Sequence, residues 1–594
     1  MIRRKSTEVL AIVLLAAMLL VSCLLPRFAQ ATGGVAQTYE QALFGTDLIT
    51  VDIQIAEDDW QDMLENALEE EYHVANVTIN GQTFENVGIR TKGNTSLSQV
   101  ASSDSDRYSF KIEFDHYQDG QTCWGLDKLV LNNLISDATY LKEYFVYDMF
   151  AFLDMPASDY GMAEITVNGE PWGIYLALEG VEESFLTRNF GTSAGLLYKP
   201  ENMGGGGPGG MKGKDSDEVR EMMGMDADAQ GLPQPPQMPG QDGEQTMPQG
   251  QPPEMNQQDT QAAGQPPQLP DAAQQPSADG QTDETAQGDW AQKMQERGAR
   301  GGGGPGGMMG GGGSDLQYTD DDLDSYETIW EGEVMDTDDA DHERVVEALK
   351  KISEGDLSGL DVDLMCKYMA LQTFVVNLDS LSGNMAHNYY LYEKDGKLAL
   401  LPWDYNLAFG GFQSGDASSV INFPIDTPVS GVTLEDRPIF AAILNDESAC
   451  ALYHSYLDKL CNEYVQGGMF ELTYTKLRSL LDSRVATSEH DPTAFYTADE
   501  YTTAVEMLKT VIEKRAESIM GQLDGSIPST TDGQQADASA LIDASDINIS
   551  AMGSQGGGGR GGHMMPWQNE TTEQPLPTDA DDAQQAQTTE TLPA

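Results

Sequence analysis

The chain of 594 residues has few cysteines and few basic residues. Five cysteines are too few for a scaffold built on disulfides. Lys and Arg total 33 against 96 Asp and Glu, which gives a formal net charge of −63. So acidic a surface repels phosphate backbones, which argues against nucleic acid as a partner. After residue 25 no apolar run approaches the length of a membrane span.

Two long stretches lack the apolar residues that a core requires. Residues 203–314 are rich in Gly, Pro, Gln and Met, and residues 524–594 are polar and Gly-rich. Neither stretch can bury enough apolar surface to offset the entropy of ordering it. The sequence therefore predicts a disordered insertion and a disordered C-terminal tail. The folded parts are residues 46–202 and 315–523, which we interpret as one fold because neither part looks complete alone.

The N-terminus has the pattern of a targeting segment. Basic residues at positions 3–5 precede an apolar run over 9–25, and a small-x-small site follows at 29–31. Residues 1–31 are thus a signal peptide or a membrane anchor, and a third interpretation is a lipoprotein with lipid on Cys23. All three predict a secreted or membrane-attached protein outside the cytoplasm. The remaining cysteines form no CxxC pair and are interpreted as buried free thiols: Cys123, Cys366, Cys450 and Cys461.

Apolar periodicity predicts an α+β fold with a sheet-rich first block and a mainly helical second block. Strands are predicted over 49–55, 74–79, 83–90, 109–114, 128–131, 162–167 and 172–178. Helices are predicted over 57–70, from Ser136 or Asp137 to about Leu153, and over 341–353, 361–376 and most of 437–523. One hairpin, 388–393 with 397–403, interrupts the helical block.

The densest group of polar side chains surrounds this hairpin. Asp379 closes an apolar helix, Asn388 begins the first strand, and Asp404 follows the second. The hairpin should bring Asn388 and Asp404 together, with Asp379 on the loop leading in. Carboxylate and amide oxygens suit Mg²⁺, and a carboxylate there can accept a proton from a substrate hydroxyl. Such residues also cap turns, so the pattern alone leaves turn-capping open.

Cations in the first block offer phosphate contacts. Residues 90–96 form a strand end with two cations, a glycine and hydroxyls, and Lys111 lies on the next predicted strand. An ordinary turn and a solvated lysine are the alternatives. The order of basic turn, strand lysine, helix, acidic connector, Asp loop, Asn and Asp is that of a protein kinase, although GxGxxG, HRD and DFG are absent.

Four segments resemble the CotH family of atypical kinases, the spore coat protein H type: 87–96, 172–179, 388–392 and 402–410. The resemblance covers roughly residues 46–202 and 316–523. It implies a two-lobed, atypical protein-kinase-like fold, with a sheet-rich N-lobe and hinge over 46–202 and a mainly helical C-lobe over 315–523. It also implies transfer of the ATP γ-phosphoryl group to protein Ser or Thr, with Mg²⁺ or Mn²⁺.

The resemblance implies roles for individual residues. Asp379 corresponds to the catalytic base, and Lys111 to the phosphate-anchoring lysine with Glu143 as its partner. The implied metal ligands are Asp404, Asn388 or its rival Asn384, and Asn406. Further contacts to ATP are implied for Arg90, Lys92 and Glu179. The family often has Asp where this chain has Asn406, which removes a charge from the metal site and leaves a weak kinase or a pseudokinase open.

Two other functions compete with a kinase. A non-catalytic surface or spore-coat scaffold would act through the low-complexity segments. A glycoside hydrolase would use Asp379 and Asp404, but the sequence shows no aromatic sugar platform. For the kinase, the expected partners are ATP and, as the acceptor, either the chain itself or a Ser-rich protein.

Overall fold

The structure, a computed structural model, describes residues 36–191, 195–200, 314–414 and 416–555. The predicted targeting segment, the predicted insertion up to residue 313 and the end of the predicted tail lie outside the described residues. So does a second unit, residues 211–308, into which the chain divides. Among the described residues, no helix combines the length and the hydrophobicity needed to cross a bilayer.

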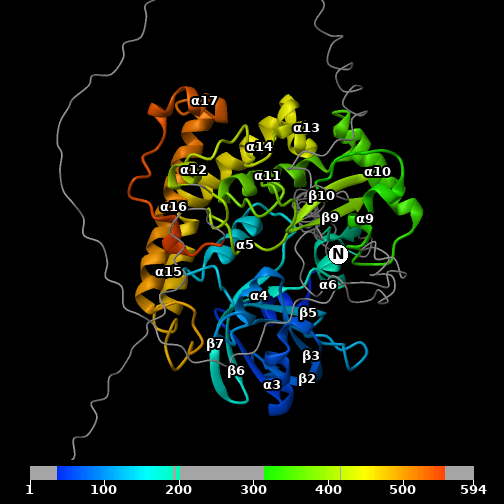
Figure 1. Ribbon diagram of the computed structural model, residues 1–594, viewed down its shortest axis with the longest axis vertical. Helices are drawn as coiled ribbons and strands as arrows, with labels where there is room; N and C mark the ends of the chain where they lie inside the picture. The colour runs from blue at the N-terminus through cyan, green and yellow to red at the C-terminus, as the bar shows by residue number, and fades with distance from the viewer. Residues whose placement is uncertain (1–35, 192–194, 201–313, 415, 556–594) are drawn as a thin grey trace, which may run out of the picture. The chain divides into compact units, whose positions relative to one another are not determined.

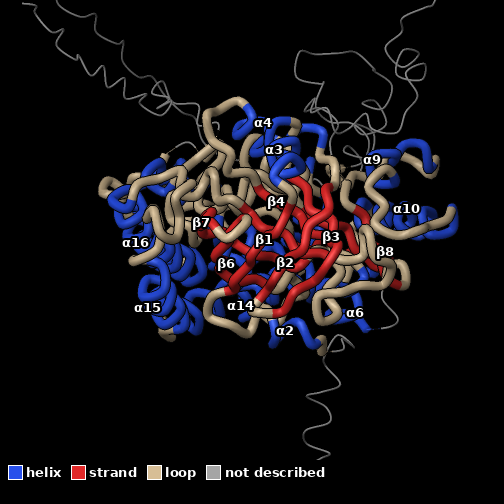
Figure 2. Tube along the Cα trace, turned by 90° about the horizontal axis from the view of Figure 1, so that it is seen from below, coloured by secondary structure: helices blue, strands red, loops and turns tan. Residues whose placement is uncertain are grey.

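In the described part of the first block, the strands close into a barrel in the order β1-β2-β3-β4-β5-β7-β6 (Figure 2). Their bounds are β1 Ile49–Ile55, β2 His73–Ile79, β3 Gln82–Lys92, β4 Ser109–Glu113, β5 Lys128–Asn132, β6 Tyr160–Val167 and β7 Glu170–Glu179. Neighbouring strands are antiparallel except β1 and β6, whose parallel pairing closes the barrel. The predicted strands are confirmed, but no local pattern indicates this closure between distant segments.

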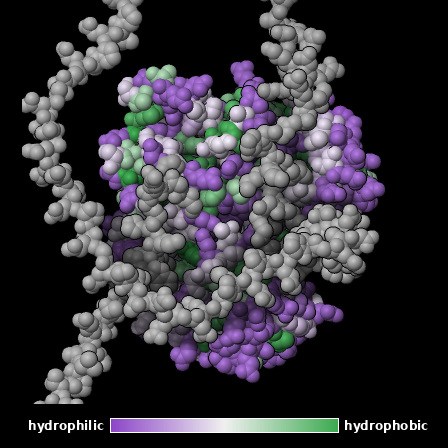
Figure 3. All heavy atoms as spheres, in the orientation of Figure 1, coloured by the Kyte–Doolittle hydropathy of each residue, from purple (hydrophilic) through white to green (hydrophobic). Residues whose placement is uncertain are grey.

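Alternation along the strands gives the barrel two apolar faces. One set of side chains fills its interior, for example Ile89, Phe110 and Tyr175. On β6 and β7 the other set, including Met162 and Leu176, joins the core of the helical block. The remaining outer surface is largely hydrophilic on the face shown in Figure 3, as the acidic composition requires.

The helical block packs against the barrel through α5, which contacts both β6 and α11 (Figure 1). The helices before residue 200 are α2 Thr38–Ala42, α3 Glu57–Glu65, α4 Thr95–Ala101, α5 Lys142–Phe152 and α6 Glu183–Phe190. The later helices are α9 Glu327–Trp330, α10 Asp339–Ser353, α11 Val362–Val375, α12 Ala417–Ile421, α13 Pro438–Asn445, α14 Glu447–Lys459, α15 Met469–Leu481, α16 Ala498–Asp524 and α17 Thr531–Ala536. A π-helical segment, Leu460–Val465, follows α14.

The predicted hairpin is confirmed as β9 Tyr389–Lys394 and β10 Lys397–Pro402. A strand from the end of the first block, β8 Leu196–Tyr198, adds to β9 and completes a three-stranded sheet. Segments from both sides of residues 201–313 therefore share one sheet.

Two predicted boundaries in the first block are wrong. Helix α5 begins at Lys142 rather than at Ser136 or Asp137. Asp137 does accept hydrogen bonds from the backbone N–H groups of Thr139 and Lys142, but Tyr140 has φ +60° and breaks the helical path. The fold also starts before residue 46, because Tyr39 on α2 is fully buried.

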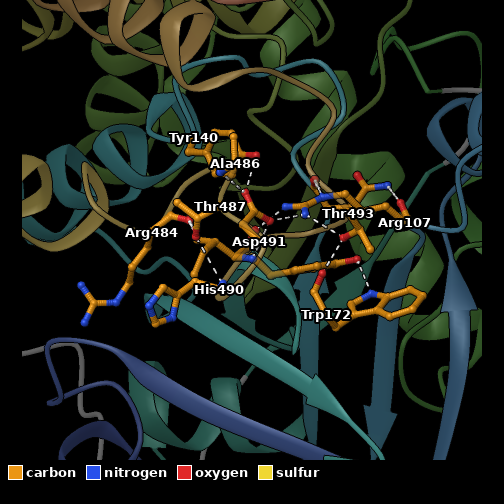
Figure 4. Close-up of polar contacts among 12 residues, drawn as sticks. Arg107, Tyr140, Trp172, Arg484, Ala486, Thr487, His490, Asp491 and Thr493 are labelled. Carbon is orange, nitrogen blue, oxygen red and sulfur yellow. Dashed lines mark hydrogen bonds and ion pairs between the residues drawn. The ribbon is translucent and has the colours of Figure 1, made fainter. Parts of the chain in front are cut away.

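A buried ion pair fastens the loop before α16 to the barrel (Figure 4). Asp491 accepts a hydrogen bond from Arg107 Nη1 at 2.5 Å, and both side chains are fully buried. The Asp491 carboxylate also accepts from Tyr140 Oη at 2.8 Å and from the backbone N–H groups of Ile174 and Ala486, each at 3.0 Å. Four donors thus compensate the buried carboxylate.

The predicted tail is ordered as far as residue 555, so a disordered segment starting at 524 is wrong. Met552 is fully buried, and its carbonyl accepts from the N–H of Ala138 at 3.1 Å. The carbonyl of Gly553 accepts from Lys142 Nζ at 2.7 Å. We call residues 549–555 the C-terminal strap. A few buried apolar residues such as Met552 hold the strap. The sequence prediction missed them because it used the average composition of residues 524–594.

The strap gives a first prediction. Met552→Ala should lower the free energy of unfolding by at least about 2 kcal/mol, because a fully buried methionine loses its packing. Urea denaturation measures the change, and Met469→Ala on the exposed face of α15 should stay within about 0.5 kcal/mol of wild type. If the two variants were equally stable, residue 552 would not be docked.

Candidate active site

The β9–β10 hairpin brings two predicted ligands to one end. Tyr389 pairs with Pro402, so Asn388 and Asp404 both lie just beyond the last pair. Both have left-handed backbone, with φ +59° and +58°. Asn and Asp are among the residues that tolerate this conformation best. The juxtaposition expected from the hairpin is therefore present.

Asp379 lies beside them on the loop after α11. Its Oδ1 is 2.6 Å from His387 Nε2, and its Oδ2 accepts from Asn388 Nδ2 at 3.0 Å. The same Asn388 nitrogen donates to the Asp379 carbonyl at 2.9 Å. These bonds use the amide nitrogen of Asn388 and leave its amide oxygen as the atom that can bind a metal.

Hydrogen bonds from Arg437 hold the loop that carries Asp379. Arg437, which is buried, donates to the carbonyls of Leu381 and Gly383, both at 2.6 Å. A Cβ at Gly383 would lie 1.9 Å from the carbonyl oxygen of Leu378, so only glycine fits there. Arg437 is a positioning residue that no sequence motif indicated.

A polar chain links the barrel to the hairpin. Lys92, the last residue of β3, donates from Nζ to Asn132 Oδ1 at 3.0 Å. Asn132 Nδ2 donates to Glu143 Oε2 on α5 at 2.9 Å. Glu143 Oε1 in turn accepts from the backbone N–H of Tyr405, next to Asp404, at 3.4 Å. The strand lysine and the helix glutamate thus belong to one hydrogen-bonded network, which ends at the residue after Asp404.

The charges of these groups act on one another's pKa values. Burial lowers the pKa of Lys92, and the carboxylates of Asp404 and Glu143 oppose that shift. Burial raises the pKa of Asp404, with Lys92 opposing and Asp379 reinforcing it. Burial, and next the charge of Asp404, raise the pKa of Glu143 to about 7. The acids repel one another and leave a strong field for cations.

A second lysine joins the site from the chain after β8. Lys199 Nζ and Lys92 Nζ each lie 5.5 Å from the centre of the Trp403 ring. The charge of Lys199 also acts on Asp404. It was missed because it lies at the edge of the low-complexity stretch, where no spacing marks it.

Lys111 belongs to a different group. Its Nζ lies 3.7 Å from Glu182 Oε1. Burial, and next the charge of Lys128, lower the pKa of Lys111 to about 8, while Glu182 opposes the shift. The prediction that Glu143 pairs with Lys111 is therefore wrong, because the lysine connected to Glu143, through Asn132, is Lys92.

The register of β3 and β4 explains why Lys92, and not Lys111, lies next to Asn132. On β3 and β4, Arg90 pairs with Lys111 and Lys92 pairs with Ser109. All four side chains share a face, but Lys92 and Ser109 stand at the end nearest Asn132, where β5 stops. Lys111 lies two residues further along β4 from that end.

Two further predicted residues, Arg90 and Glu179, bind partners outside the candidate site. Arg90 forms an ion pair with Glu70 and lies over the ring of Tyr72, 5.3 Å from its centre. Glu179 is fully buried and accepts hydrogen bonds from Tyr39 and Arg188. Both therefore serve the barrel's own structure rather than the Lys92–Asp404 group.

Asn384 and Asn406 are the remaining candidates for the metal. Asn384 is exposed, and its Cβ would lie 3.8 Å from a Cβ added at Gly431. Asn406 is partly exposed, two residues after Asp404. The role of each stays a prediction.

Fold and site together define a mixed α+β protein in which a lysine–glutamate network faces an aspartate pair. The chain belongs to the CotH family: the family described as CotH kinase protein matches residues 89–246 and 307–519, which is more than half of the sequence. A search of curated proteins found no match. Membership supports a kinase-like function and covers every residue of the network.

Proposed function

We propose that the chain is an atypical protein kinase that transfers the γ-phosphoryl group of ATP to a Ser or Thr hydroxyl of a protein. The observation that carries the proposal is the Lys92–Asn132–Glu143 chain next to Asp404. A strand lysine paired with a helix glutamate, facing a metal-binding aspartate, is the requirement of protein kinases. Family membership supports the same reaction.

The proposal extends to the two-lobed arrangement. The barrel with α5 corresponds to the N-lobe, because it supplies Lys92 and Glu143. The helical block with the β9–β10 hairpin corresponds to the C-lobe, because it supplies Asp379 and Asp404.

The donor set fits a hard divalent cation. Asp404 offers a carboxylate and Asn388 an amide oxygen, and Asn406 and Asn384 lie close by in sequence. Mg²⁺ and Mn²⁺ prefer such oxygen ligands. When bound, the metal supplies positive charge that neutralises the β- and γ-phosphate oxygens.

The lysines act on the nucleotide. Asn132 and Glu143 hold Lys92 in place, so its ammonium can bind a phosphate oxygen without first being ordered. Lys199 provides a second cation, because its Nζ lies as close to the centre of the Trp403 ring as that of Lys92. Both reduce the charge repulsion that would otherwise exclude a triphosphate from so acidic a protein.

Asp379 acts on the acceptor. His387 and Asn388 fix its carboxylate, which orients the Ser or Thr hydroxyl and accepts its proton. The hydroxyl oxygen bonds to the γ-phosphorus as the bond from that phosphorus to the β–γ bridging oxygen breaks. ADP leaves with the electron pair of the broken bond.

The substrate and location belong to the proposal as well. The N-terminal sequence supports a location outside the cytoplasm, and the family resemblance supports a spore coat. A Ser-rich protein, or the chain itself, would be the acceptor.

The test is phosphoryl transfer by the purified full-length chain. With γ-³²P-labelled ATP and millimolar Mg²⁺ or Mn²⁺, label should appear on Ser or Thr of the chain or of a Ser-rich protein, and EDTA should abolish it. Nucleotide binding without transfer would indicate a pseudokinase, in which Asn406 weakens the metal site. Absence of both would overturn the proposal.

Lysine substitutions distinguish the two candidate anchors. Lys92→Met should reduce transfer by about 10²-fold or more, because one fixed charge on the phosphates is lost. Lys111→Met should reduce it by less than about 10-fold, since Lys111 binds Glu182. Initial rates at several ATP concentrations measure both effects, and the reverse order would restore Lys111 as the anchor.

A further inference from the structure

A second cluster of possible ligands lies on α14, made of residues that the candidate active site does not use. Cys450 and His454 are four positions apart, so they share one face of the helix. Asp426, on the loop before α13, faces them. His454 Nε2 is 2.7 Å from Asp426 Oδ1 and 3.8 Å from Cys450 Sγ. One ligand atom from each residue lies within 4.8 Å of the other two.

These separations approach those of a tetrahedral zinc site. Bond lengths of about 2.0–2.3 Å require ligand atoms about 3.3–3.6 Å apart. The sulfur–nitrogen distance of 3.8 Å needs to shorten by roughly 0.2 Å, and the nitrogen–oxygen distance of 2.7 Å needs to widen by roughly 0.6 Å; small side-chain rotations supply both changes. All three residues are partly exposed, so a metal ion can reach them and water can be the fourth ligand.

The chemistry of the ligands selects the metal. A thiol and an imidazole beside one carboxylate suit Zn²⁺, whereas Mg²⁺ prefers oxygen alone. We propose that Asp426, Cys450 and His454 form a zinc site separate from the magnesium nucleotide site. Zinc would bind the Cys450 thiolate, and the thiol proton would pass to solvent.

The surroundings indicate a structural role for this site. The Asp426 N–H donates to the Ser529 carbonyl at 2.8 Å, and Thr427 Oγ1 lies 2.8 Å from Thr531 Oγ1. Zinc would thus join α14 to the segment that leads from α16 into α17, upstream of the C-terminal strap.

The test uses the full-length chain and Zn²⁺ alone. After treatment with EDTA and dialysis, calorimetric titration should show one equivalent of Zn²⁺ bound. Cys450→Ser and Asp426→Asn should each weaken that binding by at least about 100-fold, as loss of a ligand should exceed the 10–100-fold cost of changes around a site. Co²⁺ should give a thiolate charge-transfer band that Cys450→Ser removes.

His73→Asn is the matched control, because His73 pairs with a single carboxylate, Asp62, at 3.8 Å. It should bind Zn²⁺ like wild type. Wild type that binds no Zn²⁺, or binding that survives both ligand changes, would overturn the proposal and leave a simple Asp426–His454 hydrogen bond. The readout needs no ATP, so its outcome is independent of the kinase proposal.

Discussion

Replacing Asp404 by Asn should lower the rate of phosphoryl transfer by about 10³-fold or more, the scale of losing a principal charge on the transferring phosphates. Asp404 is the one proposed ligand at the hairpin end that carries a charge, because Asn388 and Asn406 are neutral. The amide keeps the shape of the side chain but removes this charge. Initial rates at saturating ATP and fixed Mg²⁺ measure the loss, and raising Mg²⁺ should restore part of it.

Asp395→Asn provides the matched control. Asp395 lies in the turn at the opposite end of the same hairpin, with φ +53° before Gly396. Asn-Gly is favoured in such a turn, so the variant should fold and transfer phosphate like wild type. Equal rates for the two variants would show that the charge of Asp404 takes no part in the reaction.

Removing the Asp491 carboxylate should have the largest effect on stability. Asp491→Ala leaves the fully buried Arg107 guanidinium without its counter-charge, and three further donors lose their acceptor. Breaking a buried pair in this way costs about 3–5 kcal/mol. Urea denaturation should therefore show a free energy of unfolding lower by that amount.

A surface pair sets the scale for this effect. Glu471 lies 2.5 Å from Lys509 Nζ on exposed parts of α15 and α16. Glu471→Ala should change the free energy of unfolding by no more than about 1 kcal/mol. If Asp491→Ala cost as little as Glu471→Ala, the loop before α16 would not be anchored to the barrel through Arg107.

The hairpin part of the site could be predicted from the sequence because local rules determine it. Asp395-Gly396 is a strong turn signal, and two strands paired across it must end together. Asn388 and Asp404 therefore had to meet. Asp379 could be placed near them too, since it lies on the short loop between the end of α11 and the same hairpin.

The barrel part of the site could not be predicted in the same way. Lys92 and Lys111 are both lysines on strands facing one side, so alternation alone cannot rank them. The choice depends on where β5 stops and on where α5 places Glu143. The positions of Lys199 and Arg437 in the site depend on contacts between distant segments, which periodicity does not encode. The pairing of β1 with β6 that closes the barrel also depends on such contacts.

The prediction of a disordered tail from residue 524 was wrong for a different reason. Its average composition is polar, and composition predicts order only for a segment as a whole. Met552 and the carbonyl of Gly553 nevertheless dock next to the start of α5. Lys142, whose pKa burial lowers to about 8 while Asp137 opposes the shift, is held by that carbonyl. The strap thus supports the helix that carries Glu143.

A crystal structure with a non-hydrolysable ATP analogue and Mg²⁺ would show where the nucleotide binds. We expect the β- and γ-phosphates between Lys92 and Asp404, with the metal on Asp404 and the Asn388 amide oxygen. Phosphates bound instead at Lys111 and Lys128, or a nucleotide that leaves Asp404 uncontacted, would contradict it.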